Sequence, residues 1–369
     1  MDGDLVGIQY GGRTLEAPVW RLPGQALDTL TLPLGYGRRR AGRFGSGIGF
    51  DANALRTASA PWLASGADVH PTGRRTELAT TQHHHRMEGG EPLRTATLTS
   101  YRQAGGVLVD QPALPSLYPP WSRSGHAWGM SIDLNACIGC GVCTLACQAE
   151  NNIPSVGKAQ VRRGREMHWI RVDRYFAGPA AAPRMLFQPV PCMHCEDAPC
   201  EVVCPVGATL HDSEGLNLQV YNRCVGTRFC SNNCPYKVRR FNFLQYTGPF
   251  TEAQRNPQVT VRMRGVMEKC TYCLQRINAA RIEVQTSGRA LRDGDVVTAC
   301  QGACPTRAIL FGDLNLEDSE VAQAQASGRS YRLLHELGTR PRTTYRVRLS
   351  HPNPGLAPDG DRGTGGEPS

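Results

Sequence analysis

One run of four cysteines constrains this chain more than any other feature. Its members, separated by two, two and three residues, are Cys137, Cys140, Cys143 and Cys147. Gly139 and Gly141 stand within the run, and glycine lets a backbone curl tightly enough for the first three thiolates to converge. Cys147 lies one helical turn beyond Cys143, so it points at a different centre. This spacing is typical of a loop that binds one iron–sulfur cluster and lends its fourth cysteine to another.

Three further cysteine motifs supply the partners that such a loop needs. They are Cys192-x2-Cys195-x4-Cys200-x3-Cys204, Cys224-x5-Cys230-x3-Cys234, and Cys270-x2-Cys273 followed by Cys300-x3-Cys304. All 15 cysteines lie between residues 137 and 304. A disulfide framework would not favour repeated two-residue gaps, and zinc sites usually take two cysteine pairs instead of a run of four. The pattern therefore favours iron–sulfur clusters over zinc or disulfides.

The shared fourth cysteine of each motif predicts which thiols hold which cluster. The first and fourth motifs form one ferredoxin-like pair, and the second and third motifs form another. The predicted 4Fe–4S ligand sets are Cys137, Cys140, Cys143 and Cys304; Cys147, Cys270, Cys273 and Cys300; and Cys192, Cys195, Cys200 and Cys234.

Three cysteines remain, and they predict a smaller cluster. Cys204, Cys224 and Cys230 are left over, and Thr227 stands where a cubane loop would place its middle cysteine. A neutral hydroxyl is a poor iron ligand beside thiolates, so three ligands and a 3Fe–4S cluster are predicted. The alternative is that Thr227 is a loop hydroxyl and that a distant group supplies a fourth ligand. Three 4Fe–4S clusters and one 3Fe–4S cluster use all 15 cysteines.

The net charge does not indicate a nucleic-acid partner. The formal charge of +9 counts thiols as neutral, whereas four clusters would add roughly −8. The basic runs at 162–165 and 237–240 are interpreted as cluster-compensating or solvated faces. No apolar run approaches the ~18 residues that span a bilayer, and no signal peptide is visible. We expect a chain that reaches a membrane through a partner.

The remaining patterns predict five regions. These are 1–102, β-rich; 103–126, a proline-rich linker; 127–315, the four-cluster domain; 316–350, a helical segment; and 351–369, a disordered tail. Residues 5–10 and 14–20 flank Gly11-Gly12 and predict a hairpin. Other predicted elements are strands at 29–34, 95–101, 130–134, 166–176 and 258–264, a hairpin at 209–220 and a helix at 275–283.

Several polar features have two interpretations. The glycine-rich loop at 35–49 could bind phosphate, but a strand before it and a helix after it are not clear, which favours simple turns. His83–His85 could bind a metal, but three adjacent side chains do not readily converge on one ion, which favours an exposed loop. His194 and His211 lie near cluster motifs, where tuning or packing is favoured over ligation. No acid–base or nucleophile constellation stands out, so no catalytic residue is predicted.

The order of the four motifs resembles the four-cluster iron–sulfur subunits of the molybdopterin oxidoreductase superfamily. Within it, residues 131–152, 162–174 and 191–200 are similar to the large iron–sulfur subunit of alternative complex III. Ala17-Pro-Val-Trp20, Pro23-Gly-Gln-Ala26 and Gly35-Tyr-Gly-Arg38 are similar to the dinucleotide-binding barrel of molybdoenzymes. The resemblance implies an α+β fold, in which a β-rich barrel remnant precedes a tandem ferredoxin-like, bis-dicluster domain. No molybdenum cofactor is expected.

The same resemblance implies an electron-transfer subunit without a catalytic site of its own. Electrons from quinol at a polytopic membrane subunit would enter through the 3Fe–4S cluster and leave toward cytochrome c or an oxidase. The chain would belong to a hetero-oligomer, peripheral on the periplasmic face of the cytoplasmic membrane. Two alternatives stay open: the electron-transfer subunit of a molybdopterin-dependent nitrate, polysulfide or dimethylsulfoxide reductase, and a zinc-stabilised assembly module. The family's long N-terminal domain and twin-arginine-type signal have no counterpart here, which leaves a fragment, an alternative start or a split subunit.

Overall fold

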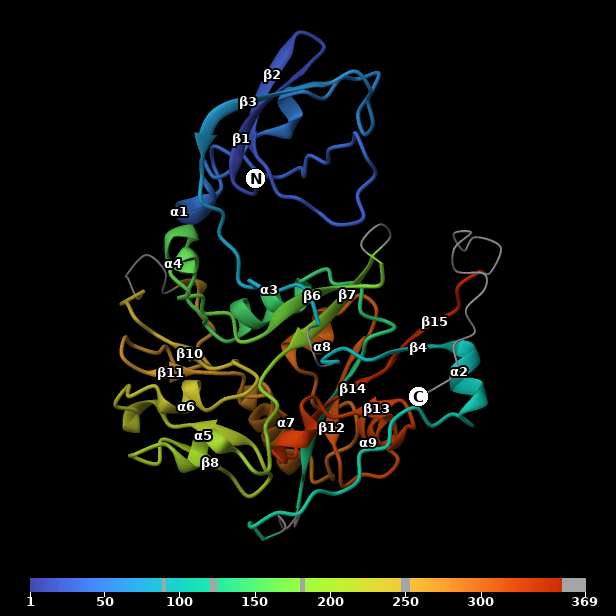
Figure 1. The fold of residues 1–369 in the computed structure, drawn as a ribbon. Helices are drawn as coiled ribbons and strands as arrows, with labels where there is room; N and C mark the ends of the chain where they lie inside the picture. The colour runs from blue at the N-terminus through green and yellow to red at the C-terminus, as the bar shows by residue number, and fades with distance from the viewer. Residues whose placement is uncertain (88–90, 120–124, 180–182, 247–252, 354–369) are drawn as a thin grey trace. The chain divides into compact units, whose positions relative to one another are not determined.

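The computed structural model describes residues 1–87, 91–119, 125–179, 183–246 and 253–353 (Figure 1). The chain divides into two compact units. Unit 1 comprises Met1–Arg86, Pro154–Met167 and Tyr175–Met185, and unit 2 comprises Met87–Ile153, His168–Arg174 and Leu186–Ser369. Residues 87–102, which the sequence grouped with the N-terminal region, therefore belong to unit 2.

A three-stranded antiparallel sheet is the framework of unit 1. Its strands are β1 (Asp4–Tyr10), β2 (Arg13–Pro18) and β3 (Asp68–Arg75), in the order β2-β1-β3. The pairing of β1 with β2 confirms the predicted hairpin. Gly11 and Gly12 make its turn at φ values of 57° and 74°, which residues with a Cβ avoid. Ile8, Ala17 and Leu55 form a small buried core.

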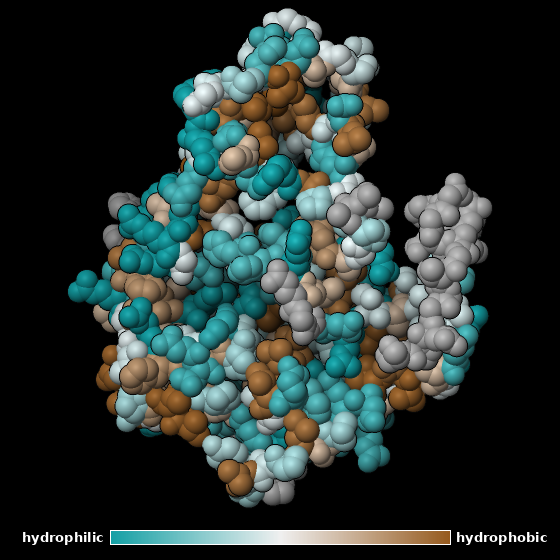
Figure 2. Space-filling view, in the orientation of Figure 1, coloured by the Kyte–Doolittle hydropathy of each residue, from teal (hydrophilic) through white to brown (hydrophobic). Residues whose placement is uncertain are grey.

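Little else in unit 1 is regular. Its short helices are α1 (Gly42–Gly45), η1 (Ala52–Ala54) and α4 (Lys158–Arg162). Many large apolar side chains of its N-terminal segment are exposed, among them Leu27, Tyr36 and Trp62, and Figure 2 shows apolar side chains at the surface of this unit. The predicted barrel remnant is not confirmed, because the described strands within residues 1–86 form an open sheet of three.

The predicted strand at 29–34 is wrong. Asp28 takes a left-handed conformation with φ 54°, and Gln25 Nε2 donates a hydrogen bond to the Thr29 carbonyl at 2.8 Å. Pro33 removes a further backbone donor. These local features occupy one backbone acceptor and remove one donor, which disfavours strand pairing.

A four-stranded sheet crosses the centre of unit 2. Its order is β12 (Ile309–Asp313), β5 (Trp128–Asp133), β14 (Thr343–Arg346) and β13 (Ser330–Tyr331). β5 pairs antiparallel with β12 and parallel with β14. The first five residues of β5 are all buried, so both faces of this strand are covered by protein. Strand β5, which the sequence predicted, leads directly into the first cysteine motif.

The other elements of the cluster region lie between these strands in sequence. They are α3 (Val142–Glu150), β6 (Arg171–Ala177), β7 (Arg184–Val190), α5 (Pro199–Val202), β8 (Thr209–His211), β9 (Asn217–Gln219), η2 (Tyr221–Arg223), α6 (Phe229–Asn232), β10 (Arg240–Phe241), β11 (Met267–Glu268), α7 (Leu274–Thr286) and α8 (Ala299–Ala303). The β8–β9 hairpin and helix α7 were predicted. The predicted strand at 258–264 is wrong: Asn152 Nδ2 donates to the Val259 carbonyl at 2.8 Å, which occupies an acceptor that a strand ladder would use.

The strand predicted at 95–101 is only partly a strand in the structure. Strand β4 (Thr95–Thr97) pairs with β15 (Arg348–Ser350), and helix α2 (Leu98–Gln103) replaces the rest of the predicted strand at 95–101. Thr97 Oγ1 accepts a hydrogen bond from the Ser100 amide at 3.0 Å and caps this helix.

The segment 316–350, which was predicted to be helical, is helical only over α9 (Glu320–Ala326) and the short η4 (His335–Leu337). Leu334 lies at φ 51°, which a continuous right-handed helix does not allow, and β14 beyond it joins the central sheet. Of the predicted tail at 351–369, only residues 351–353 lie within the described part of the chain.

Candidate iron–sulfur cluster sites

The first predicted ligand set lines one cavity. Its thiols are those of Cys137, Cys140, Cys143 and Cys304. The loop that follows β5 carries the first two, and contacting helices α3 and α8 bring the others together. Gly139 lies at φ 70°, and a Cβ there would approach the Phe187 ring to 2.3 Å. Glycine is therefore required in this loop for both conformation and space.

The second predicted set is entirely buried. It consists of Cys147, Cys270, Cys273 and Cys300. The other three thiols contribute to the raised pKa of Cys147, after burial itself, so the four lie close together. Asn151 Nδ2 lies 3.6 Å from Cys147 Sγ and 3.9 Å from Cys273 Sγ, and the Ala299 amide donates to Cys273 Sγ at 3.4 Å. Donors of this kind favour negative charge on sulfur.

The third predicted set also lines a single cavity and is buried throughout. Its members are Cys192, Cys195, Cys200 and Cys234. Arg239 Nη1 donates to Cys200 Sγ at 3.3 Å, and Asn217 Nδ2 lies 3.8 Å from the same sulfur. These two polar side chains were not among the predicted site residues. The basic run at 237–240 was the signal that pointed toward Arg239.

The three remaining cysteines lie nearer the surface than the second and third sets; in the first set, Cys140 is exposed and Cys304 is half-buried as well. Cys204 and Cys224 are half-buried, Cys230 is buried, and Thr227 is exposed. Backbone amides donate to two of the sulfurs: Ala208 to Cys204 at 3.2 Å, and Met267 to Cys224 at 3.4 Å. Helix α6, which carries Cys230, contacts helix α5, which precedes Cys204. The shared cluster of these three thiols stays a prediction.

The chemistry of the four-cysteine sets fits an iron–sulfur cluster. None of the 15 cysteines forms a disulfide. Burial raises the pKa of Cys143 to about 11 and the pKa values of Cys200 and Cys300 to about 12. Thiolates at such positions need nearby positive charge, which iron would supply. A bound cluster supplies one-electron oxidation and reduction, and the residues described here hold and surround it.

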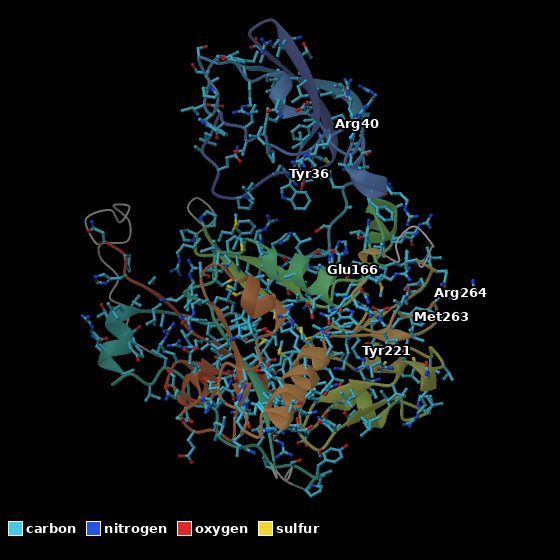
Figure 3. All side chains as sticks on the ribbon, turned by 180° about the vertical axis from the view of Figure 1, so that it is seen from behind. Tyr36, Arg40, Glu166, Tyr221, Met263 and Arg264 are labelled. Atoms are coloured by element: carbon cyan, nitrogen blue, oxygen red, sulfur yellow. The ribbon has the colours of Figure 1, made fainter. Side chains whose placement is uncertain are left out.

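A buried ion pair supports the strand before the fourth motif. Arg262 Nη2 contacts Glu268 Oε2 at 2.8 Å, with both side chains almost fully buried. Trp169 Nε1 and Asn242 Nδ2 donate to the same carboxylate at 3.2 and 3.0 Å. The Arg262 guanidinium also lies 5.7 Å from the ring centroid of Tyr221, which Figure 3 labels. Burial raises the pKa of Tyr221 to about 12. Sequence patterns held no signal for this network.

The histidines near the cluster motifs have protein partners. His194 is fully buried; its Nδ1 accepts from the Asn217 amide at 3.1 Å, and its Nε2 lies 3.1 Å from the Cys270 carbonyl. Both nitrogens are thus used within the protein, and the ring stacks on Tyr272 at 3.7 Å between centroids. His211 Nδ1 lies 2.7 Å from Glu201 Oε1. These contacts favour the predicted tuning or packing role over ligation.

The two other polar features have structural explanations. In the loop at 35–49, the amides of Gly37 and Gly47 donate to the carbonyls of Ile48 and Arg38 at 2.8 Å, which favours turns over phosphate binding. His85 stacks edge-on against Trp20 at 6.2 Å. Across the described ranges, no group of three or more His, Cys, Asp or Glu side chains is arranged to hold a single metal ion.

These arrangements define a ferredoxin-type protein with several clusters, and comparisons with known proteins agree. Models of the 4Fe-4S dicluster domain match residues 136–208 and 223–308, and a second model of that description matches residues 183–247. The chain is similar to the iron–sulfur cluster-binding subunit of menaquinone reductase from Nitratidesulfovibrio vulgaris, with 44% identity over 59% of this chain and 88% of that protein. It is also similar to the iron–sulfur subunit of arsenate respiratory reductase from Shewanella sp., with 32% identity over 59% and 94%.

A third relative is a polysulfide reductase subunit from Wolinella succinogenes, with 31% identity over 58% of this chain and 91% of that protein. This chain belongs to the family of iron–sulfur subunits of molybdopterin-oxidoreductase-type complexes, built on tandem 4Fe-4S dicluster domains. No helix among the described residues has the length and apolar character needed to cross a membrane.

Proposed function

We propose that this chain is the electron-transfer subunit of a membrane-associated, quinol-linked oxidoreductase complex. The observation that carries this proposal is the gathering of thiols, most of them buried, into separate four-cysteine sets within a chain of this family. A series of clusters in one protein serves to pass electrons between a donor and an acceptor at different places. The chain itself contributes burial, spacing and electrostatics, and the donor and acceptor sites belong to partner subunits.

The ligand assignment follows the crossed pairing. Each four-cysteine set holds one 4Fe–4S cluster, and Cys204, Cys224 and Cys230 hold a 3Fe–4S cluster beside Thr227. Electrons enter at this 3Fe–4S cluster, which the half-buried positions of Cys204 and Cys224 leave within reach of a partner. The predicted division into an N-terminal region, a linker at 103–126 and a cluster domain at 127–315 is part of this proposal.

The reductase-type complex is the better supported of two candidate assemblies. The relatives above are named as subunits of menaquinone, arsenate and polysulfide reductases, which favours a molybdopterin-dependent reductase partner. Alternative complex III, with cytochrome c as acceptor, is the second candidate. It is favoured by unit 1, because the β1–β2 hairpin and the loop at 35–49 precede the residues that match the dicluster models.

The partner of the proposed complex is a polytopic membrane subunit that binds quinol, with this chain peripheral on the periplasmic face. Anaerobic purification of the tagged chain from its native membranes should recover such a subunit, together with visible absorption, iron and acid-labile sulfide. Molybdenum in the same preparation would identify the reductase type, and haem c without molybdenum would identify alternative complex III. A colourless, zinc-loaded chain would overturn the proposal.

A further inference from the structure

The basic run at 237–240 contains three cations in different surroundings. Lys237 is exposed, and its Nζ donates to the Asn232 carbonyl at 2.8 Å. Arg240 is half-buried, and its Nε donates to the His168 carbonyl at 3.0 Å. Arg239 is only 5% exposed. The run is therefore solvated at one end and buried in its middle.

Arg239 is directed at the third cysteine set. Its Nη1 donates to Cys200 Sγ at 3.3 Å. No ion pair among the described residues includes Arg239, although a buried guanidinium without a counter-charge is costly. Its Nε–H is buried and has no hydrogen-bond acceptor among those residues. A thiolate-bound cluster in the cavity that Arg239 lines would supply the negative charge that balances this cation.

The β8–β9 hairpin holds the guanidinium in place. Arg239 Nη2 donates to Thr209 Oγ1 at 2.9 Å and to Gln219 Oε1, while Nη1 also lies 3.4 Å from Asn217 Oδ1. All three partners are neutral, so they orient the guanidinium without cancelling its charge. Lys269, the other buried cation near Cys200, instead donates to the Cys270 carbonyl at 2.8 Å.

We propose that Arg239 is the built-in counter-charge of the cluster held by Cys192, Cys195, Cys200 and Cys234, and that it raises the reduction potential of that cluster. This inference rests on the proposed cluster assignment. On reduction the cluster gains one electron and becomes more negative, and a fixed positive charge in a low-dielectric interior stabilises that form. Donation to a ligand sulfur acts in the same direction.

The test is an EPR-monitored redox titration of the purified complex, with chemical mediators supplying electrons and with iron measured in every sample. Arg239→Gln removes the charge. Gln219→Glu keeps Arg239 and places a carboxylate against it. Arg239→Lys retains the charge, and Lys237→Gln removes an exposed charge from the same run as the matched control. Cys200→Ser identifies which midpoint belongs to this set.

We expect Arg239→Gln and Gln219→Glu to lower the equilibrium constant for reduction of that one cluster at least tenfold. For a one-electron couple this is a fall of about 59 mV in its midpoint potential. Arg239→Lys should lower it less, and Lys237→Gln should leave every midpoint unchanged. Unchanged midpoints in an iron-replete Arg239→Gln complex, or an equal shift in Arg239→Lys, would overturn the inference. If Arg239→Gln loses iron, Gln219→Glu becomes the deciding variant, and unchanged midpoints in its iron-replete complex would overturn the inference. A wild-type complex without a cluster at these cysteines would instead refute the proposed function.

Discussion

Two of the four-cysteine sets differ from the three-cysteine set in how the protein surrounds them. The sets containing Cys147 and Cys192 are fully buried, and polar side chains point at their sulfurs. The first set is intermediate, because Cys140 is exposed and Cys304 is half-buried. Around the three-cysteine set, Cys204 and Cys224 are half-buried and Thr227 is exposed. Large apolar residues next to these positions in sequence, Val225 and Phe229, are exposed as well. A buried cluster depends on charge compensation from its own chain, whereas a surface cluster can obtain it from solvent or a partner.

The largest expected effect comes from breaking a four-cysteine set. Cys304→Ser should remove the cluster bound by the first motif, more than 150 residues upstream in sequence, because Cys304 lines the same cavity as Cys137. Iron content should fall by about four of roughly fifteen atoms per chain. Cluster-resolved EPR of the reduced protein measures the loss.

Cys300→Ser is the matched control for Cys304→Ser, since it lies four residues away on the same helix–loop segment. It should damage the cluster of Cys147, Cys270 and Cys273 instead. Damage to that second cluster alone in Cys304→Ser would show that the crossed pairing is wrong.

The next effect concerns the three-cysteine set. Thr227→Cys supplies the missing thiolate and should convert the 3Fe–4S cluster into a 4Fe–4S cluster, with a gain of about one iron per chain. The oxidised wild type should show the EPR signal of a 3Fe–4S centre, and Thr227→Cys should lose it and have a lower potential at that site. Thr227→Ser keeps a hydroxyl and should retain the signal. Absence of the signal in anaerobically prepared wild type would refute the assignment.

A smaller effect, on thermal stability, is expected from breaking the buried Arg262–Glu268 ion pair. Glu268 lies two residues before Cys270, and the amide of its neighbour Met267 donates to Cys224 Sγ. Glu268→Gln leaves Arg262 charged, buried and unpaired, which should cost about 3–5 kcal/mol. The temperature at which the visible cluster absorption disappears should fall by roughly 10 °C.

The exposed pair Arg307–Glu320 provides the comparison for that ion pair. Both of its side chains are more than half exposed, so Glu320→Gln should leave the same transition temperature nearly unchanged. Equal shifts in Glu268→Gln and Glu320→Gln would contradict the view that burial makes the Arg262–Glu268 pair important.

The smallest expected effect is the difference between two glycine substitutions in the first cysteine loop. Gly139→Ala should weaken the cluster of Cys137, Cys140, Cys143 and Cys304 by about 1–3 kcal/mol more than Gly141→Ala does, because its Cβ would collide with the Phe187 ring. Gly141→Ala shares the left-handed conformation, with φ 74°, but has open space, so only the backbone cost of about 1–2 kcal/mol remains. Rates of iron loss to a chelator measure the difference. Faster loss of iron from Gly141→Ala than from Gly139→Ala would contradict this prediction.

Features that depend on neighbouring residues were predictable from the sequence. The β1–β2 hairpin follows from Gly11-Gly12, and the β8–β9 hairpin and helix α7 lie within or close to their predicted ranges. Local signals also explain two failures. Leu334 at φ 51° interrupts the helix predicted for the C-terminal segment, and the Thr97 cap begins a helix where a strand was predicted. A propensity pattern does not include such single-residue conformations or side-chain caps.

Cysteine spacing was enough to predict the chemistry, because it restricts which thiols a short loop can bring to one centre. The surroundings of those thiols depend on the packed chain. Packing joins β14 parallel to β5, buries Arg239 while leaving Lys237 in solvent, and pairs Arg262 with Glu268. Parallel pairing, burial and ion pairing depend on where distant segments meet. Neighbouring basic residues look alike in a sequence, and only the packed interior gives one of them a low-dielectric contact with sulfur.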